Sequence, residues 1–302
     1  MRVVVTGATG LIGRALTRSL LADGHTVIAL VRDATRVGSR LGSAHVFTWD
    51  PMVGSPPASA LEDADVVIHL AGEPVADRRW TEAQKTLIRD SRVIGTRNLV
   101  NGMRSAVKTP RVLIGGSAIG FYGDRGDELL DDQSSNGSDF LARVCADWES
   151  EAATARSLGT RVVALRTGIV LSADAGALPK IVQPFRMFVG GPLGNGRQWM
   201  SWIHLNDEVG LIRHAMDNTE ISGPMNATAP ESVRNLQFAS TLGKVLGRPA
   251  LVPTPRFALN LVLGERADVI LASQRVRPAV AERTKYQFRF PELNAALRDL
   301  LR

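Results

Sequence analysis

Near its start the chain carries the segment Val3-Val4-Val5-Thr6-Gly7-Ala8-Thr9-Gly10-Leu11-Ile12-Gly13. Three β-branched residues in succession favour a buried parallel strand. Glycines follow at positions 7, 10 and 13, and apolar residues then recur at helical spacing until Gly24, which favours the end of a helix. The segment therefore predicts a strand, a glycine-rich turn and a helix in direct succession.

This succession is the context that a dinucleotide-binding site requires. The first glycine permits the tight turn, the second lets a pyrophosphate approach the backbone, and the third lets helix and strand pack closely. The helix N-terminus adds free N–H groups and positive potential. The alternative is a glycine-rich turn that only packs a helix on a sheet. The predicted site comprises Gly7, Thr9, Gly10, Leu11, Ile12 and Gly13.

Length and composition place the chain among ordinary globular proteins. With 302 residues, 44% of them apolar and 22% charged, it can bury a large core in one large domain or two joined domains. No apolar run is long enough to span a bilayer, and Met1-Arg2 leads directly into the first strand, so we expect neither a membrane segment nor a signal peptide. The single cysteine, Cys145, excludes an internal disulfide and favours a cytoplasmic location.

The distribution of charged residues argues against two classes of ligand. The net charge of +6 is spread along the chain without a basic block, so we expect a solvated surface and no nucleic-acid partner. The five histidines show no metal-ligand spacing, and no metal is predicted. The expected partner is a small-molecule substrate, bound by a monomer or a homodimer.

The end of the second predicted strand, residues 26–31, selects the cofactor. An acidic side chain there would hydrogen-bond the ribose hydroxyls of NAD, but the aligned residue is Val31 and Arg32 follows it. An arginine can pair with a 2′-phosphate, which favours NADP(H). Asp33 complicates this interpretation unless it pairs with Arg32 or Arg36. The alternative is that Arg32 is an ordinary surface arginine.

Further strands deliver candidate residues to the same edge of the predicted sheet. Strands and helices alternate through residue 166, with strands expected at 46–48, 65–70, 111–116 and 161–166. In a doubly wound parallel sheet, residues just past the carboxyl end of a strand line the ligand crevice. The candidates for the cofactor are Trp49, Leu70, Ala71, Gly72, Ser117, Arg166 and Gly168. Ser117 is also a candidate hydrogen-bond donor to a substrate carbonyl or hydroxyl.

The segment up to residue 166 also contains signals for helix starts, and the composition of the sequence changes after it. Thr81-Glu82-Ala83-Gln84 is a capping box that opens a long helix, and another helix is expected from near Asp139. Residues 178–196 are expected to be rich in loops, with glycines at positions 190, 191, 194 and 196. We expect residues 1–166, rejoined by 201–217, to form a Rossmann-type doubly wound α/β domain. Residues 167–302 then form a smaller, mostly helical lobe on the substrate side.

At this point the chain resembles the extended short-chain dehydrogenase/reductase superfamily. More closely it resembles the atypical branch labelled epimerase family protein, with a C-terminal region of the DUF1731 type. The resemblance implies a Rossmann fold, NADP(H) binding and a C-terminal substrate lobe, and it leaves the substrate open. The residues that carry it are Thr6 to Gly13, His69-Leu70-Ala71-Gly72, Ser117, Tyr122-Gly123, Trp80-Thr81, Trp148-Glu149, Gly190-Gly191-Pro192-Leu193-Gly194, Gly196-Arg197-Gln198-Trp199, Trp202-Ile203-His204 and Asn226-Ala227-Thr228-Ala229-Pro230.

The resemblance has a gap where the superfamily's chemistry resides. That chemistry uses a tyrosine and a lysine at i and i+4, the lysine lowering the pKa of the tyrosine that passes the proton. The matching positions here are Leu141 and Cys145, which cannot exchange a proton in that way and fit an apolar helix stripe. Ser117 remains of the usual trio, and Tyr122 is a weak candidate because no neighbouring lysine is evident. We expect Leu141 and Cys145 to be largely buried, with Cys145 unreactive.

A second gap concerns the substrate. Sugar-nucleotide enzymes of the superfamily place an arginine for the diphosphate where this chain has Met200-Ser201-Trp202, although Arg197 could substitute from the preceding loop. Trp199 and Trp202 more often pack than bind, but beside a glycine-rich loop their indoles could form the wall of an apolar or aromatic substrate site.

Two functions follow from these residues. The main hypothesis is an NADP(H)-binding oxidoreductase or epimerase-like protein of unknown substrate. The alternative is a catalytically weak or inactive NADP(H)-binding sensor or interaction module, which the missing tyrosine–lysine pair favours.

Overall fold

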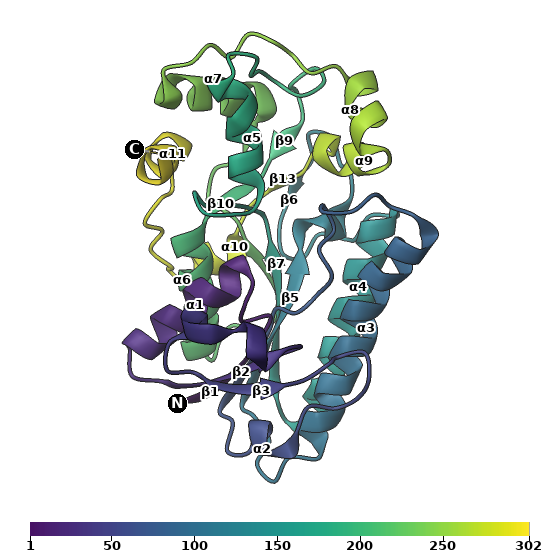
Figure 1. The fold of residues 1–302 in the computed structure, drawn as a ribbon, viewed down its shortest axis with the longest axis vertical. Helices are drawn as coiled ribbons and strands as arrows, with labels where there is room; N and C mark the ends of the chain where they lie inside the picture. The colour runs from purple at the N-terminus through teal and green to yellow at the C-terminus, as the bar shows by residue number, and fades with distance from the viewer. Residues whose placement is uncertain (302) are drawn as a thin grey trace.

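The computed structural model describes residues 1–301, apart from the side chain of Arg36. Its centre is a seven-stranded parallel sheet in the order β11-β7-β5-β4-β1-β2-β3 (Figure 1). The sheet strands are β1 (Arg2–Thr6), β2 (Thr26–Val31), β3 (His45–Thr48), β4 (Val66–His69), β5 (Val112–Ala118), β7 (Arg161–Thr167) and β11 (Gly223–Ala227). Because β1 lies between β2 and β4, the strand order reverses there, and the predicted doubly wound α/β fold is confirmed.

Helices cover both faces of this sheet (Figure 1). The side chains of β1 alternate between two cores, as the two-residue period of a strand requires. Val3 and Val5 pack with α1 (Leu11–Ala22) and α6 (Leu205–Asp217), while Val4 packs on the opposite face with α3 (Glu82–Arg104). On that same face α4 (Phe140–Ala153) lies beside α3. Burial on both faces explains why the strands read as continuous apolar runs.

The predicted helix starts are confirmed by capping contacts. The hydroxyl of Thr81 accepts a hydrogen bond from the backbone N–H of Gln84 at 3.2 Å, at the start of α3. The carboxylate of Asp139 accepts one from the N–H of Ala142 at 2.9 Å, at the start of α4. Each cap satisfies a backbone donor that has no partner inside its helix.

Much of the second half of the chain, with α5 and α7 to α9, forms the upper lobe in Figure 1, whereas α6 lies beside α1 and the main sheet. The helix α5 (Ala177–Arg186), which the sequence interpretation did not identify, occupies part of the segment expected to be rich in loops. Pro179 lies in the first turn of α5, where its missing N–H costs nothing, and Leu178, Val182 and Phe185 bury one face of the helix in the lobe core. Tertiary burial thus overrides the local signal of Pro184 inside the helix.

The remaining elements are short. They are α2 (Ala58–Leu61), β6 (Leu129–Leu130), β8 (Ile169–Leu171), β9 (Trp199–Met200), β10 (Trp202–His204), β12 (Val233–Arg234), α7 (Asn235–Leu246), α8 (Arg256–Leu263), α9 (Arg266–Leu271), β13 (Arg275–Val276), α10 (Ala279–Arg283) and α11 (Leu293–Leu301), with single turns of 3₁₀ helix at Ala34–Arg36, Gly38–Leu41, Ile119–Tyr122 and Thr154–Leu158. Within residues 1–301, no helix has both the length and the apolar character that crossing a membrane requires.

The chain crosses between the two halves more than once. The helix α6 packs against α1, and β11 pairs in parallel with β7 at the edge of the main sheet. The sequence interpretation did not identify β11, whose Gly223-Pro224 start lacks the composition of a strand. A division into domains at residue 166 stays a prediction.

Candidate dinucleotide site and its surroundings

The glycine-rich turn between β1 and α1 is packed so closely that it excludes side chains. Gly7 has φ +67°, and a Cβ there would lie 2.7 Å from the carbonyl carbon of Leu70, in the loop after β4. A Cβ on Gly13 would lie 2.2 Å from the carbonyl oxygen of Gly7. The turn, the first turn of α1 and residues 70–72 therefore form one backbone cradle at the carboxyl ends of the strands.

The start of α1 leaves this cradle open to an anion. Its N-cap is Gly10, which supplies no side-chain hydrogen bond, and the first turn of the helix contains no acidic residue. Thr9 and Gly10 are exposed, while Leu11 and Ile12 are partly buried. Free N–H groups and the positive end of the helix suit a pyrophosphate, so the residues present fit a dinucleotide.

A buried histidine lies in the hydrogen-bond network that joins the end of β1 to the loop after β4. His69, at the end of β4, hydrogen-bonds Thr6 Oγ1 through Nδ1 at 2.7 Å and Thr96 Oγ1 through Nε2 at 3.0 Å. Thr6 Oγ1 also accepts a hydrogen bond from the backbone N–H of Ala71 at 3.1 Å. Burial lowers the pKa of His69 to about 4, so the ring is neutral at pH 7. His69 thus holds the loop after β4 against the end of β1.

The residues after β2 and β3 differ in exposure. Arg32, directly after β2, is exposed. Asp33 accepts hydrogen bonds from the backbone and hydroxyl of Thr35, and a pairing with Arg36 lies outside the described side chains. Trp49 is 5% exposed and donates its indole N–H to the carbonyl of Gly54 at 2.7 Å. Its ring is therefore packed in the core.

At the end of β5 the structure places Ser117 in a buried ion-pair network. Its hydroxyl donates to Glu149 Oε1 at 2.6 Å. Both oxygens of Glu149 accept hydrogen bonds from Arg166, each at 2.8 Å. The guanidinium of Arg166 also lies 3.5 Å from the ring centroid of Phe121. Arg166 is thereby committed to protein partners, and the Ser117 proton points to a carboxylate.

Tyr122 belongs to the same network. It is fully buried, accepts a hydrogen bond from Arg166 at 3.0 Å and donates to the side-chain oxygen of Asn226 at 2.6 Å. Burial raises its pKa to about 12, which is the opposite of what a general acid–base tyrosine needs near neutral pH. The geometry therefore gives Tyr122 a structural role that joins β7, β11 and the segment after β5.

The helix α4 carries the positions where the superfamily has its tyrosine and lysine. Cys145 is 5% exposed, and burial raises the pKa of its thiol to about 11. Leu141, in the first turn of α4 beside Gly120, is partly buried. One turn after Cys145 stands Glu149, whose pairing with Arg166 the sequence interpretation missed.

The tryptophans of the lobe have separate environments. Two guanidinium groups contact the ring of Trp199, that of Arg234 at 4.1 Å and that of Arg275 at 4.6 Å from the ring centroid. The Trp199 side chain lines a hollow of about 200 Å³. Trp202 is 1% exposed, and its buried indole N–H has no partner among the described residues. Arg197 is exposed, so of these three residues Trp202 alone is a core side chain.

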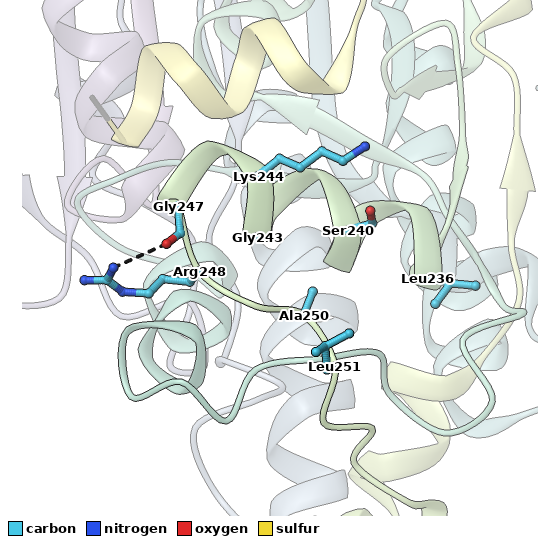
Figure 2. A pocket seen from close by; sticks show the side chains of 8 residues that line it. All are labelled: Leu236, Ser240, Gly243, Lys244, Gly247, Arg248, Ala250 and Leu251. Carbon is cyan, nitrogen blue, oxygen red and sulfur yellow. Dashed lines mark hydrogen bonds between the residues drawn. The ribbon is translucent and has the colours of Figure 1, made fainter.

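Two further features lie around these groups. Gly168 allows a close approach of strands, since a Cβ there would lie 2.6 Å from the carbonyl oxygen of Ser201. A hollow of about 600 Å³ opens between α7 and Ala250-Leu251 (Figure 2). Its walls are lobe residues, so it is separate from the glycine cradle. Ser117 lies at the same edge of the sheet as the cradle, which includes residues 70–72. Arg197 and Trp199 belong to the lobe.

Fold and cradle together define a class, that of doubly wound α/β proteins with a dinucleotide-binding turn. The chain belongs to the NAD dependent epimerase/dehydratase family, which matches residues 3–227, and this confirms the resemblance. Residues 254–300 match a domain of unknown function, DUF1731.

Relatives and solved structures resemble the chain over its whole length. The epimerase family protein Mb2239 of Mycobacterium bovis is 40% identical over 98% of this chain and 96% of that protein. The chloroplastic SDR39U1 homolog of Arabidopsis thaliana is 38% identical over 100% of this chain and 87% of that protein. The crystal structure of human epimerase family protein SDR39U1, isoform 2, with NADPH superposes with a TM-score of 0.88 at 34% identity, over 99% of each chain.

Proposed function

We propose that this protein is an NADP(H)-dependent oxidoreductase or epimerase that acts on a small-molecule substrate where β1, β4 and β5 end. The observation that carries the proposal is the cradle, in which Gly7 and Gly13 allow contacts that no side chain permits beside an uncapped helix N-terminus. The human SDR39U1 structure, described with NADPH, supports the choice of cofactor. When bound, the cofactor supplies or accepts a hydride.

The residues of the chain divide the work of binding and orientation. The backbone N–H groups at the start of α1 bind the pyrophosphate, and the exposed guanidinium of Arg32 pairs with the 2′-phosphate. Ser117 donates a hydrogen bond to the reacting oxygen of the substrate by turning away from Glu149. Glu149 then still has both oxygens bonded to Arg166, so the turn leaves no unpaired buried charge.

Titration with reduced cofactors tests the proposal. NADPH is expected to bind more tightly than NADH, measured by the change in cofactor fluorescence on purified protein. Equal affinities would show that Arg32 does not bind the 2′-phosphate. Failure of both cofactors to bind would refute the proposed function.

A second candidate function is an NADP(H)-binding module with little chemistry. It is favoured by the absence of a proton donor in the usual place, since Cys145 is a buried thiol and the pKa of Tyr122 is raised to about 12. A screen of carbonyl compounds and sugar nucleotides at saturating NADPH, followed by absorbance, separates the two. Turnover of any substrate class supports the enzyme, and binding without turnover supports the module.

Two finer points belong with this proposal. The protein acts in the cytoplasm as a monomer or homodimer, with no nucleic-acid partner. A single free, buried thiol suits a reducing compartment. Size-exclusion chromatography with light scattering measures the oligomeric state directly.

A further inference from the structure

One cation near the cradle, Arg92, forms no ion pair with a carboxylate of the described residues. Arg92, on α3, lies over Gly72, since a Cβ on that glycine would be 3.1 Å from the guanidinium carbon. Its Nη1 donates to the carbonyl oxygens of Glu73 at 3.0 Å and Ile88 at 2.9 Å. The guanidinium carbon stands 5.0 Å from the ring centroid of Trp148. The group is therefore held in one place by two hydrogen bonds and an aromatic face.

The remaining donors of Arg92 are free. Among the described residues, no carboxylate forms an ion pair with this guanidinium, and hydrogen bonds are made by its Nη1 and not by its Nε or Nη2. Burial lowers the pKa of Arg92, and the charges of Cys145 and Glu73 act in the opposite direction. Two other arginines of α3 contrast with it, because Arg89 pairs with Asp147 and Arg97 with Glu151. A partly buried cation without a partner is costly, and such groups ordinarily meet an anion.

The position of Arg92 ties it to the cradle on one side and to Ser117 on the other. Gly72 lies in the same loop as Leu70, whose carbonyl carbon would meet a Cβ on Gly7 at 2.7 Å. The thiol of Cys145 feels both the Arg92 charge and the Ser117 hydroxyl, which each lower its pKa against the effect of burial. The guanidinium thus stands where β4 and β5 end, next to Cys145.

We propose that Arg92 binds the carboxylate of a small organic-acid substrate through the open Nε–Nη2 edge of its guanidinium. Two parallel N–H groups match the two oxygens of a carboxylate, which a single ammonium cannot do. The inference rests on the proposed function, because it takes the ends of β4 and β5 as the place where the substrate binds. It deepens that function by naming an acidic substrate in place of a neutral carbonyl compound.

Calorimetric titration of protein saturated with NADP⁺ tests this. The probes are oxalate and benzoate, and their neutral counterparts are oxamide and benzamide. The variants are Arg92→Met, Arg92→Lys and the matched control Arg89→Met, which removes an exposed arginine from the same helix. Unchanged melting temperature and NADP⁺ affinity show that each variant is folded.

The expected result is saturable binding of at least one acid to the wild type and to Arg89→Met, and none of the neutral probes. Arg92→Met weakens that binding tenfold or more, and Arg92→Lys weakens it by less, because it keeps the charge and loses the two-pronged geometry. If Arg92→Met does not fold, Arg92→Lys carries the test on its own, with a measurable loss of acid affinity expected.

Three results would overturn the inference. They are failure of both acids to bind the wild type, equal acid affinity in wild type and both Arg92 variants, and a loss of NADP⁺ affinity in Arg92→Met as large as the loss of acid affinity. The last would assign the guanidinium to a cofactor phosphate. Failure of NADP⁺ to bind the wild type is a different outcome, since it refutes the proposed function itself.

Discussion

Adding one methyl group at Gly13 is expected to damage both the fold and the cofactor site. The Cβ of Gly13→Ala would lie 2.2 Å from the Gly7 carbonyl oxygen, 2.7 Å from Ala8 Cα and 2.9 Å from the Gly7 carbonyl carbon. All three are backbone atoms, so no side chain can rotate away. The turn must open by about 1 Å to reach an ordinary contact.

The size of the effect follows from two opposing contributions. Overpacking of this kind costs about 1–3 kcal/mol, whereas alanine gains at most about 1 kcal/mol over glycine in a helix. We expect a net loss of roughly 1–2 kcal/mol in the free energy of unfolding, with a melting temperature lower by about 2–4 °C per kcal/mol. NADPH affinity should fall by more than about tenfold, because the opening displaces the N–H groups that face the pyrophosphate.

The assay combines thermal unfolding with NADPH fluorescence titration. Gly54→Ala is the matched control, since an added Cβ there has nothing within 4 Å and the backbone needs no positive φ. Gly13→Ala with the melting temperature and NADPH affinity of Gly54→Ala would refute the reasoning, because the turn would then have room that the contacts deny.

Three further outcomes follow from the same contacts. Arg32→Ala should remove most of the preference for NADPH over NADH, because it removes a charge-assisted contact of about 1.5–3 kcal/mol, and it should leave NADH affinity unchanged. A preference that is retained in the titration would exclude Arg32 from binding the 2′-phosphate. Ser117→Ala should reduce kcat far more than it weakens NADPH binding, and unchanged turnover would make Ser117 a packing residue. Glu208 is fully buried, Thr167 donates to its Oε1 at 2.8 Å, and burial raises its pKa to about 8. The folded protein therefore keeps the Glu208 proton that the unfolded chain releases above about pH 4.5. The free energy of unfolding consequently falls as the pH rises from about 4.5 to 8, by up to roughly 1.4 kcal/mol per pH unit. Urea unfolding of wild type and Glu208→Gln across that range should show the difference, and parallel pH profiles would contradict it.

Local patterns in the sequence were enough to predict much of the sheet. The run from Val3 to Gly13 predicts strand, turn and helix, because each of these depends on residues within a few positions of one another. The caps at Thr81 and Asp139 are equally local, since a side-chain oxygen reaches an N–H three residues on. The choice of NADP(H) likewise rests on Arg32, directly after one strand.

The elements that were missed depend on distant contacts. The helix α5 contains Pro184, and it forms because its apolar face is buried by other parts of the lobe. The strand β11 begins with Gly223-Pro224 and exists because β7 offers it a partner across some 60 residues of chain. The residues of the segment alone indicate neither the helix α5 nor the strand β11.

The sequence by itself determined the doubly wound class of this protein and its glycine cradle, because both arise from short-range periodicity and from residues that permit special backbone geometry. Only the tertiary structure decided the state of its charged groups. Arg166 meets Glu149 from a different element, whereas Arg92 meets no carboxylate among the described residues. The physical reason is that pairing and desolvation depend on distances in space, which the linear order of residues does not contain.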